Sequence, residues 1–214
     1  MAEKTLMERT KRLRVKGTGP HRSELVMFKK LGDIPRDCID ELNQFLDQFK
    51  GRDDIGTDNY KISQALDYQK VFANGGHYRQ VLMQDRNDKE GIEVDEYLYD
   101  KWVEDFKVKQ ELAKYFKRVF RFRMSEMIGE HSLNWHIDSC TSVMCRAQIC
   151  LNENDAVFEF RDKKQTHSFQ MKPGELWFIN TGWPHRVVTG ERMRRVAILG
   201  YHFDDLIKND LLRV

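Results

Sequence analysis

Two histidines and an aspartate stand at a spacing that suits a metal site. His136 and Asp138 are separated by one residue, which on a strand places both side chains on the same face. His185 follows at the start of a later apolar stretch. Two imidazoles and one carboxylate on one face of an octahedral ion leave three positions open, which suits Fe(II) oxygen chemistry. Because a His-x-Asp pair also recurs by chance, the alternative is a surface or capping pair.

Two arginines stand ten residues after the two histidines. Arg195 follows His185 and, by strand alternation, shares a face with Ala197 and Leu199. A cation among core residues needs an anion, and the distal carboxylate of 2-oxoglutarate would match the donor fork of a guanidinium. Arg146 follows His136 in an equally apolar stretch. For both arginines the alternative is a structural pair with a carboxylate of the protein itself.

The elements that must position these residues are short strands. From residue 119 onward, apolar residues alternate or cluster in short segments, separated by turn residues such as Pro173-Gly174 and Thr189-Gly190. This pattern predicts a mainly β member of the α+β class with a jelly-roll, cupin-like core, also called a double-stranded β-helix. The predicted strands are Val119 to Ile128, Leu133 to Asp138, Val143 to Leu151, Ala156 to Arg161, His167 to Met171, Glu175 to Asn180, His185 to Val188 and Arg194 to Phe203.

The N-terminal part is predicted to support this core. Residues 1–23 are rich in Lys and Arg and indicate a flexible basic arm, which leaves 24–214 as a single domain. Apolar residues at helical spacing predict a helix over 36–50 that Gly51 ends, and a second helical stripe over 93–116. Between them, 52–91 is irregular and suggests a lid or binding loop. We therefore expect mostly helices and loops over 24–118 and the jelly roll over 119–203.

Composition excludes several classes of protein. The 214 residues are 40% hydrophobic and 11% aromatic, enough for a packed core. A net charge of +2 argues against a dedicated nucleic-acid binder. No apolar run approaches the length of a membrane span, and the N-terminus lacks a secretory signal, which together predict a cytoplasmic protein. The four cysteines form no CxxC pair and are expected to be free thiols.

Several motifs, in order, resemble the aspartyl/asparaginyl β-hydroxylase-like family, which includes cis-proline hydroxylases among the Fe(II)- and 2-oxoglutarate-dependent oxygenases. The resemblance covers about residues 119–203. The motifs that carry it are Phe122-Arg-Met-Ser-Glu-Met-Ile-Gly-Glu-His, Trp135-His-Ile-Asp-Ser, Cys145-Arg-Ala-Gln-Ile, Pro173-Gly-Glu-Leu-Trp-Phe-Ile-Asn, His185-Arg-Val and Arg195-Val-Ala-Ile-Leu.

The resemblance implies a role for individual residues. His136, Asp138 and His185 would bind iron, and Arg195 would bind the distal carboxylate of 2-oxoglutarate. Ser125 matches a hydroxyl that assists this carboxylate, and Gln148 stands where the family commonly has a histidine near the cosubstrate. Arg146 matches an arginine that meets an acid group of the substrate or cosubstrate. Two further residues are candidates from position alone: Arg123, which shares a strand face with Ser125, and Trp183, two residues before a ligand.

We therefore expect an Fe(II)- and 2-oxoglutarate-dependent dioxygenase that hydroxylates a free amino acid or similar small carboxylated molecule. Its cofactors would be Fe(II), 2-oxoglutarate and O2, with ascorbate as a reductant. We expect no nucleic-acid or membrane partner, and the sequence does not indicate an oligomeric state. Two alternatives stay open: a hydroxylase of Asp, Asn or another residue within a peptide, and a cupin-type metal-binding module without catalysis.

Overall fold

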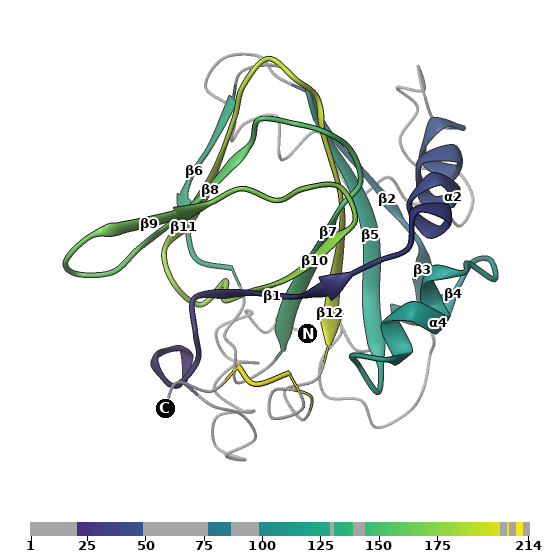
Figure 1. Cartoon of the computed structure of the whole chain (residues 1–214), viewed down its shortest axis with the longest axis horizontal. Coiled ribbons are helices and arrows are strands. Elements are labelled where there is room, and N and C mark those ends of the chain that lie inside the picture. Colours follow the sequence, from purple (N-terminus) through teal and green to yellow (C-terminus); the bar gives the residue numbers. More distant parts are fainter. Residues whose placement is uncertain are drawn as a thin grey trace, which may run out of the picture.

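The computed structural model of the chain describes residues 21–48, 77–86, 99–128, 131–138, 144–201, 205 and 209–211. Within these ranges the strands form a six-stranded sheet, a four-stranded sheet and a small two-stranded sheet, with antiparallel pairing throughout. The two larger sheets face each other, and helices α2 (Arg36–Asp47) and α4 (Val108–Ala113) lie on the far side of the six-stranded sheet (Figure 1). The predicted jelly-roll type of core is confirmed.

The six-stranded sheet has the order β1-β10-β7-β12-β5-β2, the four-stranded sheet β6-β11-β8-β9, and the small sheet pairs β3 with β4. Strands β5 to β12 match the eight predicted strands, with ends that differ by no more than two residues. The bounds are β1 Phe28–Asp33, β2 His77–Leu82, β3 Gln84–Arg86, β4 Tyr99–Trp102, β5 Val119–Ile128, β6 His131–His136, β7 Cys145–Cys150, β8 Val157–Arg161, β9 Thr166–Phe169, β10 Glu175–Ile179, β11 His185–Thr189 and β12 Arg194–Tyr201.

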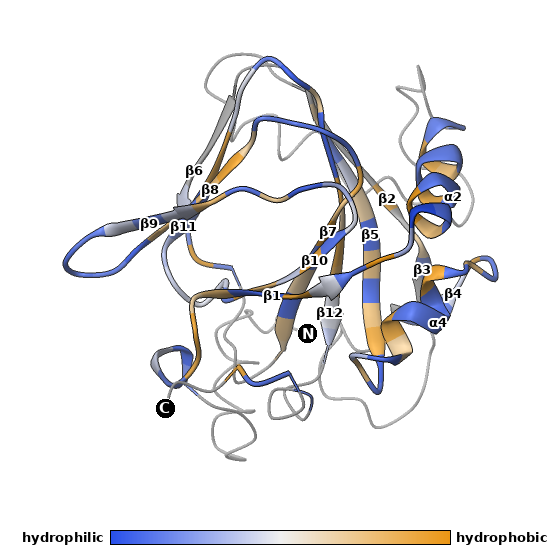
Figure 2. Ribbon diagram, viewed as in Figure 1, coloured by the Kyte–Doolittle hydropathy of each residue, from blue (hydrophilic) through white to orange (hydrophobic). Residues whose placement is uncertain are grey.

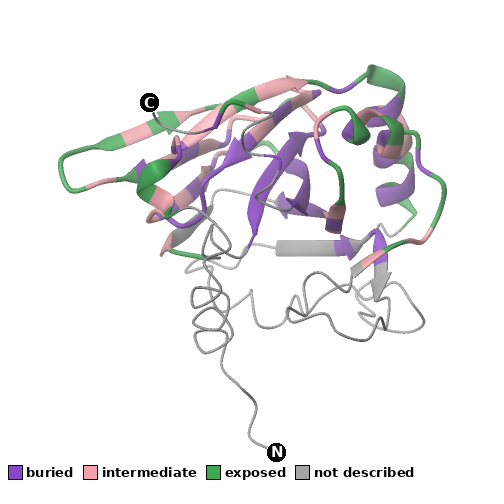
Figure 3. Ribbon diagram, turned by 90° about the horizontal axis from the view of Figure 1, so that it is seen from below, coloured by how far each residue is buried: buried purple, intermediate pink, exposed green. Residues whose placement is uncertain are grey.

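Two apolar clusters lie on the two sides of the six-stranded sheet. The outer cluster joins the sheet to α2 and α4 and includes Leu42, Leu112 and Leu199. The inner cluster fills the space between the two larger sheets and includes Phe160 and Val187. Because both of its faces are covered, β12 is buried at every position, as is β7 (Figure 3). Unlike these buried strands, the turn between β8 and β9 consists mainly of hydrophilic residues (Figure 2).

Helix α2 follows the predicted apolar spacing. It buries Ile39, Leu42 and Leu46 against the outer face of the six-stranded sheet, and Pro35 occupies its N-cap. The helix ends at Asp47, three residues before the predicted end, and Gly51 lies outside the described residues. None of the described helices combines the length and apolar character that a membrane span requires.

The prediction of mostly helices and loops over 24–118 is only partly correct. β1 pairs with β10 at one edge of the six-stranded sheet, and β2 pairs with β5 at the other. In the described part of the predicted helical stripe, residues 99–116, the structure has the strand β4 and the short helix α4. Trp102 and Phe106 are four residues apart and in contact, with ring centroids 6.1 Å apart, but they meet across a bend rather than on a helix face. Helical spacing alone therefore misled the prediction.

The loop predicted over 52–91 is corrected where it is described, because β2 and β3 occupy 77–86. The rest of that range lies outside the described residues, as do residues 1–20 of the predicted basic arm. The last residues of the arm are ordered: Arg22–Glu24 form the 3-10 helix η1. The cysteines at 38, 145 and 150 are buried free thiols, and Cys140 is not described.

Candidate active site

The two histidines predicted to bind metal lie on neighbouring strands. His136 ends β6, and His185 begins β11. The two residues are register partners in this antiparallel pair, and their ring centroids are 4.3 Å apart. Asp138 follows two residues later, where its backbone N–H donates to the carbonyl of Thr181 at 3.1 Å. Strand pairing thus joins residues that are distant in the sequence.

The three side chains form a compact set of potential ligands. One donor atom from each of His136, Asp138 and His185 lies within 4.8 Å of the others. The carboxylate oxygens of Asp138 are 3.5 Å from His136 Nε2 and 3.8 Å from His185 Nε2. Two donor atoms that bind an octahedral ion at right angles, each about 2.1 Å from it, are about 3 Å apart. A small inward movement of these side chains would therefore fit a divalent ion. The donor set itself, two imidazoles and a carboxylate, suits Fe(II).

The surroundings of His185 prepare its ring for metal binding. Its Nδ1 lies 2.9 Å from the carbonyl oxygen of Trp183, so the Nδ1–H donates there and leaves Nε2 facing Asp138. Burial lowers the pKa of His185, and the nearby His136 and Arg146 act in the same direction. These effects outweigh the opposing influence of Asp138 and Trp183. The neutral, metal-binding form of the ring is therefore favoured.

Asp138 carries the negative charge of the set. Desolvation raises the pKa of its carboxyl group, but Arg146, the two histidines and Arg123 together outweigh this effect, and the net pKa is lowered. Arg146 contributes most among these charges. The Asp138 side chain keeps 42% exposure, whereas His185 keeps 5%. The cluster therefore has one buried side and one side that opens toward solvent.

Arg195 does not lie where the sequence predicted. Its Nη2 forms ion pairs of 2.7 Å with Glu126 on β5 and with Asp47 on α2. Its Nη1 also donates to Asn43 on α2 at 3.2 Å. The side chain thus faces the helix layer, on the opposite side of the sheet from the inner cluster. This orientation argues against the expectation that Arg195 binds 2-oxoglutarate, because the two carboxylates that meet this buried cation belong to the protein.

The adjacent residue, Arg194, points between the two larger sheets. Its guanidinium donates to Gln148 Oε1 at 2.7 Å and lies 4.9 Å from the ring centroid of Phe158. Phe158 lies two residues from Phe160, the register partner of His185. Two residues along a strand span about 7 Å, so Arg194 lies deeper in the same interior than the metal ligands. Its side chain is buried.

The remaining predicted polar residues share the inner face of the six-stranded sheet. Ser125 alternates with Met127 of the inner cluster, and Gln148 with Cys150. Ser125 is fully buried, and its Oγ has no hydrogen-bond partner within the described part of the chain. An unsatisfied buried hydroxyl indicates a missing polar partner. Arg123 and Arg146 lie on this face by the same alternation, and both act on Asp138.

Trp183 lies beside the cluster rather than in it. Its indole Nε1 donates to the carbonyl of Arg22 at 3.2 Å, and the Arg22 guanidinium lies 5.0 Å from the centre of its ring. The Arg22 side chain also donates to the carbonyl of Gly182. This contact covers the turn before His185 with the segment around η1. A role for Trp183 at the mouth of the site stays a prediction.

Comparison with known proteins supports the fold. No protein-family model matches the chain, and a search of curated proteins found no match. Among solved structures, a Trichoplax adhaerens prolyl hydroxylase bound to a hypoxia inducible factor peptide aligns over 95% of both chains, with 16% identity and a TM-score of 0.50. The structure of EvdMO1 aligns with 85% of this chain and 48% of its own, with 14% identity and a TM-score of 0.53. A Burkholderia pseudomallei 2OG-Fe(II) oxygenase aligns over 94% of this chain and 93% of its own, with 13% identity and a TM-score of 0.48.

The match to the prolyl hydroxylase, with a TM-score of 0.50, shows that the chain has the same jelly-roll type of fold. The His136, Asp138 and His185 cluster lies within this fold as a possible metal site. The three residues of this cluster are predicted from the sequence, as are Ser125 and Gln148 on the inner face of the sheet, but Arg194 is not predicted as a site residue. The one signal in the sequence that points to Arg194 is strand alternation, which places it on the same strand face as Val196 and Ile198 and on the opposite face from Ala197.

Proposed function

We propose that the protein is an Fe(II)- and 2-oxoglutarate-dependent hydroxylase. The observation that carries this proposal is the buried Arg194 in the same interior as the cluster of two histidines and one aspartate. A barrel that only binds a metal ion has no need of a buried guanidinium about two strand residues deeper than the metal ligands. Arg194 thus argues against the non-catalytic alternative in the way first expected of Arg195.

The residues present fit the groups that this function requires. His136, Asp138 and His185 would hold the metal, Arg194 would bind the distal carboxylate of 2-oxoglutarate, and Ser125 Oγ would add a neutral hydrogen bond. When bound, Fe(II) with 2-oxoglutarate and O2 supplies the oxidant for a C–H bond, with release of succinate and CO2. Gln148, which accepts from Arg194, would fix the guanidinium for its ligand.

The protein's own residues would orient the substrate and exclude water. Phe160 stacks on His185, with ring centroids 5.6 Å apart, and forms an apolar wall behind the ligands. Arg146 and Arg123 act on Asp138 and lie on the inner face of the sheet. We propose that Arg146 binds a carboxylate of the substrate, since a guanidinium offers a two-pronged contact to that group. This supports a small carboxylated molecule, such as a free amino acid, as the substrate. As a finer proposal, we place the chain near the aspartyl/asparaginyl β-hydroxylase-like family.

Succinate release tests this function directly. The purified protein would be incubated with Fe(II), ascorbate, 2-oxoglutarate and O2 across a panel of free amino acids and short peptides. We expect one group of small acids to raise turnover well above the uncoupled rate. Stimulation by peptides alone would favour a peptidyl hydroxylase. Absence of 2-oxoglutarate turnover and of 2-oxoglutarate binding by the metal-loaded protein would refute the proposal.

A further inference from the structure

A pocket lies on the opposite side of the six-stranded sheet from the candidate metal centre. It has a volume of about 470 Å³ and lies between α4, the segment that joins α4 to β5, and β4. Two of its lining residues, Leu112 and Phe116, belong to the outer apolar cluster, which the sheet separates from the inner one. Its size falls in the range of small-molecule sites.

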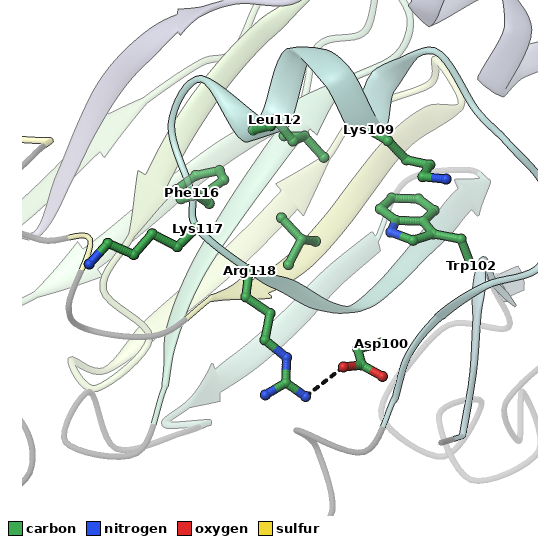
Figure 4. A pocket seen from close by; sticks show the side chains of 9 residues that line it. Asp100, Trp102, Lys109, Leu112, Phe116, Lys117 and Arg118 are labelled. Carbon is green, nitrogen blue, oxygen red and sulfur yellow. Dashed lines mark hydrogen bonds and ion pairs between the residues drawn. The ribbon is translucent and has the colours of Figure 1, made fainter. Parts of the chain in front are cut away.

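One wall of this pocket is aromatic and rigid. Trp102 is partly exposed, and its indole ring packs on Phe122 and Phe106 with centroid distances of 4.9 and 6.1 Å. Leu112, Phe116 and Val119 form the facing apolar side, on which Leu112 and Phe116 are only 1% and 2% exposed. Figure 4 shows Trp102 on one side of the pocket and Leu112 and Phe116 on the other. A flat group could therefore enter between walls that already exist, at little cost in side-chain entropy.

The charged residues of the pocket favour an anion. Its lining includes three cations, Lys109, Lys117 and Arg118, and one carboxylate, Asp100, and Lys109 is paired at 2.6 Å with Asp105 outside the lining. Asp100 is 13% exposed and lies 2.7 Å from Nη2 of Arg118, whose side chain is 42% exposed. This ion pair at the edge of the pocket holds the guanidinium beside the apolar slot (Figure 4). A guanidinium has five N–H donors and can bind more than one acceptor at a time.

We propose that this pocket binds a small aromatic carboxylate, with the ring between Trp102 and the Phe116 wall and the carboxylate at Arg118. The partly exposed ring of Trp102 favours a flat apolar group, and the positive balance of the lining favours an anion over a cation with the same ring. A ligand that joins a flat apolar body to one anionic group satisfies both parts of the pocket. The proposal does not depend on the proposed hydroxylase function, because the two sites lie on different faces of the sheet.

Binding of phenylacetate tests this assignment. Isothermal titration calorimetry would use the full chain with Zn(II) and 2-oxoglutarate present, so that the cations of the metal centre are already occupied. We expect saturable binding of phenylacetate with a dissociation constant of about 1 mM or tighter, within reach of one charged contact and one buried ring. Phenethylamine, which carries an ammonium group on a similar ring, should bind at least about tenfold more weakly.

Matched variants locate the site. Arg118→Gln should weaken phenylacetate by about tenfold or more, the usual effect of removing a charge-assisted hydrogen bond. Ala113→Phe, at an exposed position of the lining, should block the slot. Lys114→Gln is the control, because Lys114 is a neighbouring exposed cation that pairs with Glu111 and does not line the pocket. Thermal denaturation would confirm that each variant is folded.

Three results would overturn the proposal. Absence of phenylacetate binding up to about 10 mM would show that the pocket is only a packing feature. Equal or tighter binding of phenethylamine would make Asp100 the recognition group and reverse the ligand class. Binding that Arg118→Gln and Ala113→Phe both leave unchanged would place phenylacetate elsewhere on the protein. None of these results would affect the assignment of the metal centre.

Discussion

At the scale of single residues, the candidate metal site consists of three side chains that differ in exposure to solvent. His185 is buried and oriented by Trp183, whereas Asp138 is partly open to solvent. We predict that alanine at His136, Asp138 or His185 weakens binding of Fe(II) by more than about 100-fold, since even outer partners of metal ligands are worth 10- to 100-fold. Anaerobic Fe(II) titration and 2-oxoglutarate turnover would measure this effect.

His167→Ala provides the control for these three variants. His167 lies on β9 and pairs with Asp162 at 3.2 Å, away from the cluster. Its replacement should leave Fe(II) affinity unchanged. If a variant at one of the three ligand positions kept full Fe(II) affinity, that residue would not be a ligand.

Adjacent arginines on β12 provide a second test at this scale. Arg194→Lys should raise the dissociation constant for 2-oxoglutarate by about tenfold, because an ammonium cannot reproduce the two-pronged contact of a guanidinium. Arg195→Lys should leave it unchanged, since Arg195 faces Glu126 and Asp47. Calorimetry with the Zn(II)-loaded protein would compare the two variants. The reverse result would return the cosubstrate to Arg195 and contradict the strand orientation described above.

The choice between these two arginines shows where sequence reasoning ends. On a strand such as β11, alternating burial distinguishes the inner face from the outer face. On β12 both faces are buried, so alternation separates Arg194 from Arg195 but does not tell which one faces the metal. That choice depends on α2, which supplies Asn43 and Asp47 from more than a hundred residues earlier in the chain. Nothing in the sequence around β12 indicates this contact.

At the scale of elements, a stack of side chains lies behind the metal ligands. Trp135 precedes His136 and faces outward, where the guanidinium groups of Arg161 and Arg186 lie 4.6 and 4.9 Å from its ring. Arg186 is also paired with Glu159. Because Trp135 and Arg186 are neighbours of the two ligand histidines, the stack joins β6, β11 and β8 beneath the site. The stack therefore helps to hold His136 and His185 at their observed separation.

We predict that Trp135→Leu lowers the free energy of unfolding by about 1–2 kcal/mol, the sum of two partly exposed cation–π contacts. Trp135→Phe should retain part of this stability. Chemical denaturation would measure both variants, and Fe(II) titration would show whether the ligands have moved. Equal stability of Trp135→Leu and the unaltered protein would mean that the stack contributes nothing to the sheet.

Elements were predicted well wherever a strand has a covered face and clear turns. β5 to β12 follow from alternation and from breakers such as Pro173-Gly174. β1 was missed because it is an edge strand with no fully buried position, so its residues carry no strict alternation. β4 was assigned to a helix because Trp102 and Phe106 share helical spacing, although both reach the same apolar cluster from a bent segment.

At the scale of the whole molecule, an ionic network joins the helix layer to the six-stranded sheet, on whose inner face Arg194 lies. Arg195 on β12 contacts Glu126 on β5 and Asp47 on α2. Glu126 is 2% exposed, so water cannot replace its contact with Arg195. We predict that Arg195→Met lowers the free energy of unfolding by about 3–5 kcal/mol, the usual cost of removing one partner of a buried ion pair.

The double variant Arg195→Met with Glu126→Leu decides whether the network stabilises the fold or merely avoids an unpaired charge. Replacing both partners by apolar residues of similar volume is often close to neutral, because the desolvation cost of the pair disappears with its attraction. We expect the double variant to recover most of the stability lost in Arg195→Met, measured by urea denaturation. Recovery would show that the network sets the position of α2 against β12 rather than supplying net stability. No recovery would mean that the attraction between the charges exceeds their desolvation cost, and that the helix layer is held by this network as well as by apolar packing.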